Sequence, residues 1–268
     1  MFPYIRIFIF SVPTHQFFVF LAILIFILIS LWRLRTKDFS YQTFKLFPVI
    51  GIGAILGSWL SMVIPNFENI TNYNLVKFFL YSGRSLVGGI AGAYIAATLG
   101  KKFLKINFST GNVFVFALAP ALAIGRIGCF LTEIPGTQTS LPWSVKLSNA
   151  QISNIPNCVN CIERVGMHPS MLYEVLFHVL ATIILYATIN KALPIEFRWK
   201  FYLSSYAFFR FFVEFTRTNT NLLFGLSGTQ IFIIFLSPII IKKCLNEIYL
   251  LKQLKLSPSV MLQEKVTD

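Results

Sequence analysis

Long runs of apolar residues constrain this chain more than any other feature of its sequence. Hydrophobic residues make up 56% of its 268 residues and charged residues only 12%, and the mean hydropathy is +0.70. An apolar run of about 17–25 residues is long enough to cross a bilayer as a helix. The sequence therefore predicts an all-α integral membrane protein. About seven transmembrane helices are expected, at roughly residues 16–32, 46–64, 84–99, 111–124, 169–189, 200–216 and 228–246.

The net charge of +13 is gathered in clusters rather than spread evenly. Basic residues follow the first, third and fifth runs and recur in the C-terminal tail. Because cytoplasmic loops carry an excess of Lys and Arg, this pattern predicts an external N-terminus and a cytoplasmic C-terminus. It also argues against a nucleic-acid partner, which would need a basic stripe on a soluble surface. The first run is too long for a signal-peptide core and lacks a small-residue cleavage site, so we expect it to be retained.

One longer connection interrupts these runs, at about residues 125–168, and the chain is otherwise expected to form a single polytopic domain over residues 1–268. The connection lies on the outer face in the predicted topology. It starts with a dense polar passage, GRIGCFLTEIPGTQTSLPW, which contains Arg126 and Glu133. It also holds the pair Cys158 and Cys161. A single C-x-x-C is weak evidence for zinc, and an oxidising exterior favours a disulfide.

Arginines at or within the ends of the apolar runs are the second polar feature. An arginine at the centre of a transmembrane helix costs about 2.5–3.5 kcal/mol, so it is expected to face a partner, water or a ligand. The sixth run places Tyr206, Arg210 and Glu214 at i, i+4 and i+8, with Arg217 one turn further on. A structural Arg–Glu pair would explain part of this stripe, but the added phenol and second arginine favour a functional face. For Arg84 and Arg217, snorkelling to the interface is an equally good interpretation.

Small residues mark two other helices. Gly88 and Gly92 in the third run form a small-xxx-small pair, which favours close helix packing over a ligand role. In the seventh run, Ser227 with Gln230 three residues on is typical of a helix cap.

Five motifs taken in order add a resemblance to a known family. GRIGCF, TSLPW, HPSMLYE, YAFFRFFVEFTR and GLSGTQ resemble the bacterial prolipoprotein diacylglyceryl transferase family. The resemblance implies an enzyme of the bacterial inner membrane, with several membrane passes. It would transfer the diacylglyceryl group of phosphatidylglycerol to the lipobox cysteine of a prolipoprotein, releasing glycerol phosphate. The implied partners are phosphatidylglycerol, the prolipoprotein signal peptide with its lipobox, and the bilayer, and no metal or nucleotide cofactor is implied.

The resemblance also assigns residues. Arg126 and Arg210 match the family's two functional arginines, which suits a phosphate head group because a guanidinium pairs two oxygens at once. Tyr206 and Glu214 match their companions, with Glu214 orienting an arginine. The candidate catalytic residues are His15, Arg126, Tyr206, Arg210 and Glu214. The candidate substrate-binding residues are Gly88, Gly89, Arg126, Cys129, Glu133, His168 and Tyr173.

Four positions depart from the family's pattern. Val87 replaces a histidine, Cys129 replaces an asparagine, and His15 stands where the family has a tyrosine. Thr132 and Glu133 occupy the place of an asparagine–glutamate pair. If that missing histidine is the general base, His15 or His168 would have to act instead. Two alternatives therefore stay open, a paralogous lipid transferase with a different acceptor and a lipid- or anion-binding transporter.

Overall fold

The computed structural model describes residues 4–7, 10–36, 41–63, 85–154, 158, 161–191, 193–194, 196–219 and 221–256. Within these ranges the long helices are α1 (Thr14–Thr36), α3 (Leu46–Leu60), α6 (Leu86–Phe103), α7 (Gly111–Thr132), α9 (Ser170–Ala187), α10 (Phe197–Val213) and α11 (Gly228–Leu256). Short helical elements are α2 (Tyr41–Phe44), α8 (Asn149–Ile152) and the 3-10 turn η1 (Glu214–Thr216). Three antiparallel pairs complete the described structure: β1 (Tyr4–Ile7) with β2 (Phe10–Pro13), β3 (Val145–Lys146) with β4 (Gly166–Met167), and β5 (Asn221–Leu223) with β6 (Leu226–Ser227).

Each of the seven predicted apolar runs overlaps one of the long helices within the described residues. Three of these helices are long and apolar enough to cross a membrane, at Thr14–Leu34, Gly111–Thr132 and Ser170–Ala187. The prediction of a mostly helical membrane protein is confirmed, whereas the count of seven spans and the orientation of the termini stay predictions. Arg84, which the sequence left between snorkelling and function, lies outside the described residues.

The chain divides into two compact units. The first comprises Met1–Arg33, Gly111–Thr218 and Ser237–Asp268, and the second comprises Leu34–Thr110 and Asn219–Leu236. The expectation of a single domain stays a prediction.

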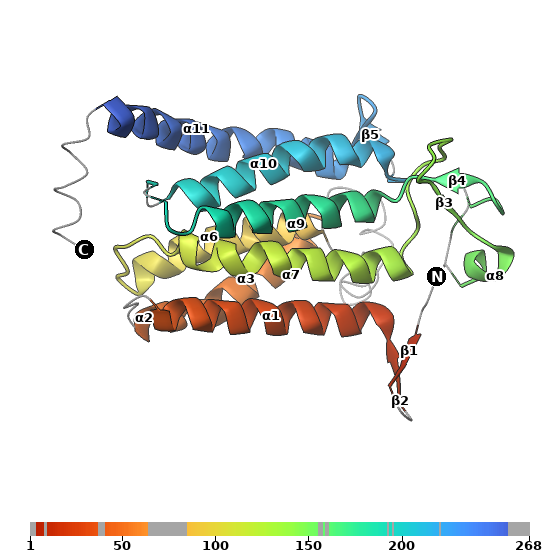
Figure 1. Ribbon diagram of the computed structural model, residues 1–268, viewed down its shortest axis with the longest axis horizontal. Coiled ribbons are helices and arrows are strands. Elements are labelled where there is room, and N and C mark those ends of the chain that lie inside the picture. The colour runs from red at the N-terminus through yellow and green to blue at the C-terminus, as the bar shows by residue number, and fades with distance from the viewer. Residues whose placement is uncertain are drawn as a thin grey trace. The chain divides into compact units, whose positions relative to one another are not determined.

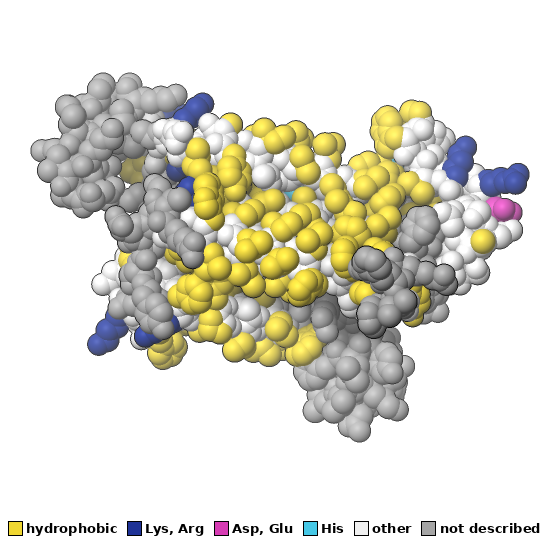
Figure 2. All heavy atoms as spheres, turned by 60° about the horizontal axis from the view of Figure 1, so that its bottom comes forward, with side chains coloured by type: hydrophobic (Ala, Val, Ile, Leu, Met, Phe, Trp, Pro, Cys, Tyr) yellow, Lys and Arg dark blue, Asp and Glu magenta, His cyan; other side chains and the backbone are white. Residues whose placement is uncertain are grey.

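Helix α7 lies at the centre of the first unit. It runs alongside α9, and α10 packs against both (Figure 1). Of the membrane-length apolar segment of α7, 56% is buried, against 6% for α1, so α7 is largely packed against protein and α1 buries few of its side chains fully. A small cluster of buried side chains joins the three central helices: Val115, Phe116, Ala119, Leu185 and Tyr202. On the face drawn in Figure 2, hydrophobic side chains are spread widely over the described surface, as expected of a protein in contact with lipid.

The end of α7 is the clearest difference from the sequence-based expectation. The apolar run ends near residue 124, but the helix continues to Thr132. The extra turns carry polar residues, among them Arg126 and Cys129, and these are buried rather than exposed. The connection to α9 therefore begins at Glu133, and Arg126 and Cys129 are helical residues.

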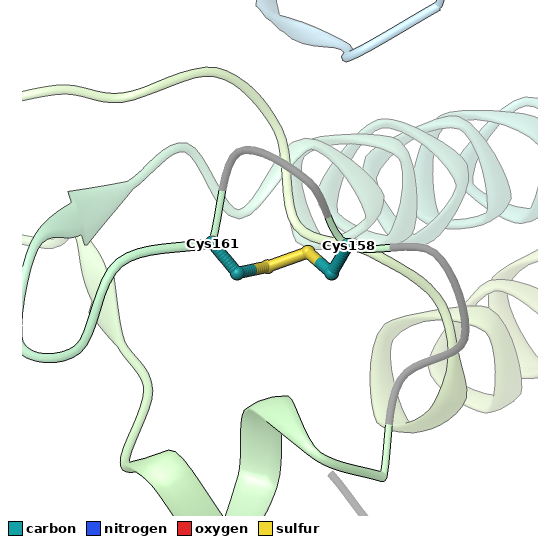
Figure 3. The surroundings of a disulfide bond; sticks show 2 residues. All are labelled: Cys158 and Cys161. Atoms are coloured by element: carbon teal, nitrogen blue, oxygen red, sulfur yellow. A yellow bond between two sulfur atoms is a disulfide. The ribbon is translucent and has the colours of Figure 1, made fainter.

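The connection between α7 and α9 has its own small core. Leu147 and Met167 are buried there, and Cys158 and Cys161 pack against them. These two cysteines form a disulfide (Figure 3), with their Cα atoms 5.4 Å apart. The predicted pairing is therefore the one that the structure contains. Both free cysteines among the described residues, Cys129 and Cys244, are buried.

Backbone hydrogen bonds tie the two ends of this connection to the end of α10. Gly136 N donates to His168 O at 2.7 Å, and Thr137 N donates to Thr216 O at 2.8 Å. Ser170 Oγ lies 2.9 Å from the same Thr216 carbonyl oxygen. A side chain at Gly136 would collide with this backbone. The C-terminal end of α7, the N-terminal end of α9 and the end of α10 are thus held together.

In the second unit, α3 and α6 pack along a seam of glycines. A Cβ atom placed on Gly57 would collide with the Gly88 carbonyl oxygen, and one on Gly92 with the Gly53 carbonyl oxygen. Such close backbone approach is typical of helix pairs with small residues at the interface. The packing interpretation of Gly88 and Gly92 agrees with this contact.

This seam leads to a prediction about stability. We expect Gly57→Ala to lower the stability of the folded protein by about 1–3 kcal/mol, because the added methyl group forces the two backbones apart. Gly51→Ala is the matched control, since it lies in the same helix and a Cβ there meets nothing within 4 Å. Thermal unfolding of the purified protein in detergent would measure both. Equal melting temperatures for the two variants would contradict the prediction.

Candidate active site

Glu174 is the centre of a buried polar cluster in the first unit. It lies in the second turn of α9, and its side chain is fully buried. Its carboxylate is 2.9 Å from Nε of Arg126 and 2.9 Å from Nη1 of Arg210. Tyr206 donates its hydroxyl hydrogen to the same carboxylate at 3.0 Å. One carboxylate therefore connects α7, α9 and α10.

Arg210 bridges two carboxylates. Its Nη1 atom bonds Glu174, and its Nη2 atom lies 2.7 Å from Oε2 of Glu214. The side chains of Arg210 and Glu214 are 5% and 1% exposed, so water contributes little to this pairing. Arg210 and Glu214, which are four residues apart on one helix, therefore form the ion pair that their spacing predicts. Its role in orienting Arg210 for catalysis stays a prediction.

Arg217 joins the same cluster from beyond the end of α10. Its Nη1 atom is 3.5 Å from Glu174 and 2.8 Å from the sulfur of Met171. Longer contacts of 3.9 Å reach Glu133 and Glu214. The side chain is only 16% exposed, so it faces the cluster rather than the solvent. Burial, followed by the neighbouring Arg210 and Arg126 guanidiniums, lowers the pKa of Arg217 from its usual value.

The cluster carries more positive than negative charge in its buried part. Three guanidiniums share two carboxylates that are almost wholly buried, whereas Glu133 is 38% exposed and 3.9 Å from its nearest arginine. The Nε groups of Arg210 and Arg217 are buried and have no hydrogen-bond partner in the described structure. An unsatisfied buried donor is costly unless a partner accepts its hydrogen bond. Spare cationic donors of this kind suit an oxyanion such as phosphate.

A second group of side chains adjoins Arg126. Cys129 Sγ accepts a hydrogen bond from Nη1 of Arg126 at 3.8 Å. A ring nitrogen of His15, Cys129 Sγ and a carboxylate oxygen of Glu133 all lie within 4.8 Å of one another. Gly128 permits this meeting of α1 and α7, because a Cβ there would lie 2.5 Å from that of Phe18. His15, from the start of α1, therefore joins Cys129 and Glu133, from the end of α7, beside the arginines.

The remaining candidates lie elsewhere. His168 Nδ1 is 3.1 Å from the hydroxyl oxygen of Tyr173, which also accepts a hydrogen bond from Trp143 Nε1 at 2.9 Å. These contacts hold His168 against Tyr173 at the start of α9 and, through it, Trp143 of the connection between α7 and α9. Gly88 and Gly89 belong to the other compact unit, so their substrate-binding role stays a prediction.

Sequence reasoning missed the central residue. The sequence shows Glu174 only as the last residue of the motif HPSMLYE, although a carboxylate near the start of an apolar helix is itself a signal of buried pairing. It also missed His178, which is fully buried and has Nδ1 3.0 Å from the Tyr202 hydroxyl oxygen. His178 lies four residues after Glu174, on the same face of α9.

Membrane-length helices around a buried arginine–glutamate cluster define this chain as a helical membrane protein with a cationic internal site. Comparison with known sequences gives the family. The family model for prolipoprotein diacylglyceryl transferase matches residues 3–242, and the chain belongs to that family. The prediction of this family from five ordered motifs, and with it the prediction of a transferase, is confirmed.

Among its relatives are proteins named phosphatidylglycerol–prolipoprotein diacylglyceryl transferase. One from Clostridium botulinum (strain Loch Maree / Type A3) is 28% identical over 216 residues, which cover 76% of this chain and 80% of that protein. One from Bordetella avium (strain 197N) is 30% identical over 186 residues, covering 66% of this chain and 65% of that protein. One from Pasteurella multocida (strain Pm70) is 36% identical over 138 residues, covering 50% and 47%. In the latter two, the chain spans less than two thirds of the relative's length.

Proposed function

We propose that this protein transfers the diacylglyceryl group of phosphatidylglycerol to the lipobox cysteine of a prolipoprotein. In the reaction the thiol loses its proton and its sulfur forms a bond to the glyceryl carbon. The bond between that carbon and the phosphate oxygen breaks, and glycerol phosphate leaves with the electron pair. The observation that carries the proposal is the surplus of buried guanidinium donors around Glu174. The names of the relatives support the same substrates.

The residues of the cluster have separate roles in this proposal. Arg126 and Arg210, with Arg217 beside them, bind the phosphate and stabilise the charge that develops on the leaving group. Such stabilisation is most effective when the donors are fixed in place before reaction. Glu174, Glu214 and Tyr206 fix them, because each contacts at least one of the arginines or their shared carboxylate.

The proposal includes the topology expected from the charge distribution. Seven helices cross the inner membrane, with the N-terminus outside and the C-terminus in the cytoplasm. Arg126, Glu174 and Arg210 then lie near the outer ends of their helices, below the connection between α7 and α9.

The decisive assay uses the purified protein in vesicles that contain phosphatidylglycerol, together with a synthetic lipobox peptide. We expect the peptide to gain the mass of one diacylglyceryl group on its cysteine, with release of an equal amount of glycerol phosphate. A peptide with serine in place of that cysteine is the control and should remain unmodified. Turnover of the lipid with no modified peptide would favour a transferase with a different acceptor. Movement of lipid without any covalent product would favour a transporter.

A further inference from the structure

Two positions at which this chain departs from its family's sequence pattern, His15 and Cys129, meet Glu133 in space. His15, Cys129 and Glu133 come from the start of α1, the last turn of α7 and the residue that follows it. We propose that these three side chains bind a divalent cation of the zinc class. In catalysis, which rests on the function proposed above, that cation takes the acceptor thiol as its fourth ligand.

The ligand atoms are of the right kind. Zinc is bound by cysteine sulfur, histidine nitrogen and carboxylate oxygen, at about 2.0–2.3 Å. Ligand atoms around one tetrahedral ion are then about 3.3–3.8 Å apart. The three atoms here all lie within 4.8 Å of one another, so small side-chain rotations bring them to that spacing. His15 and Glu133 are partly exposed, which leaves them room to rotate.

The environment also favours a cation. The Nδ1 atom of His15 is buried and has no hydrogen-bond partner in the part of the chain that the structure describes. Cys129 is itself buried, at 8% exposed. A thiolate and a carboxylate together carry two negative charges, which neutralise one divalent cation. The loaded site is therefore close to neutral, and it does not repel the adjacent Arg126 guanidinium.

Three protein ligands leave one coordination position open, which is typical of catalytic rather than structural zinc sites. A thiol that coordinates a divalent cation is deprotonated outright, and the thiolate is the nucleophilic form. The proton of the acceptor thiol passes to water, and its sulfur then attacks the glyceryl carbon as the phosphate oxygen leaves. This chain has Val87 where its family has a histidine. A cation at His15, Cys129 and Glu133 supplies the activation without that histidine.

The site is placed next to the leaving-group arginines. Cys129 Sγ is 3.8 Å from Arg126 Nη1, and Glu133 is 3.9 Å from Arg217. A thiolate held by the cation and a phosphate held by the arginines would therefore be neighbours, as a direct displacement requires.

The test begins with metal binding, which does not depend on activity. The full-length protein in detergent is stripped with a chelator, loaded with zinc and freed of unbound metal, and bound zinc is measured by mass spectrometry. We expect one zinc per chain, and at least about tenfold weaker binding in Cys129→Ser, because even changes outside the ligand shell cost about 10–100-fold. Cys244→Ser is the matched control, since it removes the other buried free cysteine, on α11, and should keep full binding. Cobalt loading adds a readout of the bond itself, a thiolate-to-cobalt charge-transfer band that Cys129→Ser should abolish and Cys244→Ser preserve.

The transfer assay then tests the role of the cation. We expect chelation to abolish transfer and added zinc to restore it. Absence of stoichiometric zinc, or equal binding by Cys129→Ser and the unmodified protein, would overturn the site. Transfer that survives chelation but is lost in His15→Gln would assign His15 as an ordinary base and overturn the catalytic role of the metal. Zinc binding that requires Cys129, in a protein with no transfer activity, would instead overturn the proposed function and leave the metal site standing.

Discussion

Replacing Glu174 with glutamine is expected to abolish most transfer activity and to destabilise the protein. The carboxylate contacts Arg126, Arg210 and Arg217, and its side chain is fully buried. A neutral amide removes the charge that all three guanidiniums share. Removal of one partner from a buried ion pair costs about 3–5 kcal/mol, because the remaining charge is left uncompensated.

The expected loss of transfer activity follows because the arginines lose their fixed positions. With Glu174 neutral, the three arginines repel one another and no longer hold one arrangement. A displacement of about 1 Å in groups that contact the reacting atoms costs about 10²-fold in rate. We therefore expect at least that loss in transfer to the lipobox peptide, together with a lower melting temperature in detergent.

Two variants make this prediction specific. Glu163→Gln is the matched control, because Glu163 is an exposed glutamate in the same unit and its described side-chain bond is to Asn149. It should change neither measurement. Glu174→Asp retains the charge but shortens the side chain, so it should recover part of the stability. Normal transfer and an unchanged melting temperature in Glu174→Gln would show that the cluster is not organised by this carboxylate.

The sequence predicted those parts of the fold and site that depend on local pattern. The helices follow from apolar runs, and the pairing of Arg210 with Glu214 follows from their spacing on one helix. The disulfide between Cys158 and Cys161 could also be predicted, because the two residues are close in the sequence. Each of these features depends only on residues that are close together in the sequence.

The central role of Glu174 could not be predicted in this way. It depends on α9 packing between α7 and α10, so that residues 126, 174 and 210 meet although they are far apart in the sequence. The same holds for His15, which reaches Cys129 only because α1 packs on Gly128 of α7. The end of α7 was misplaced for a related reason. Hydropathy treats Arg126 as the end of a buried helix, whereas its charge is neutralised by a partner on another helix.

Replacing Arg210 with lysine is expected to reduce transfer by about 10²-fold or more while the positive charge is kept. Arg210 uses its two terminal nitrogens on different carboxylates, Nη1 on Glu174 and Nη2 on Glu214. Its Nε group remains as a donor for the phosphate. A lysine ammonium is a single point of charge and cannot make these contacts in three directions. Loss of one fixed donor to a developing negative charge costs about 10²–10³-fold in rate.

Arg164→Lys is the matched control for Arg210→Lys. It makes the same chemical change at an exposed position of the connection between α7 and α9 and should leave transfer unchanged. If Arg210 acted only by charge, Arg210→Lys would retain near-normal turnover and would differ little from Arg164→Lys. If Arg210 acts through the fixed directions of its guanidinium N–H groups, the loss should appear in the rate at saturating phosphatidylglycerol. The reason is that the leaving group carries its full charge only as the bond breaks. A change confined to the lipid concentration needed for half-maximal rate would place Arg210 in binding alone and contradict its role in stabilising the leaving group.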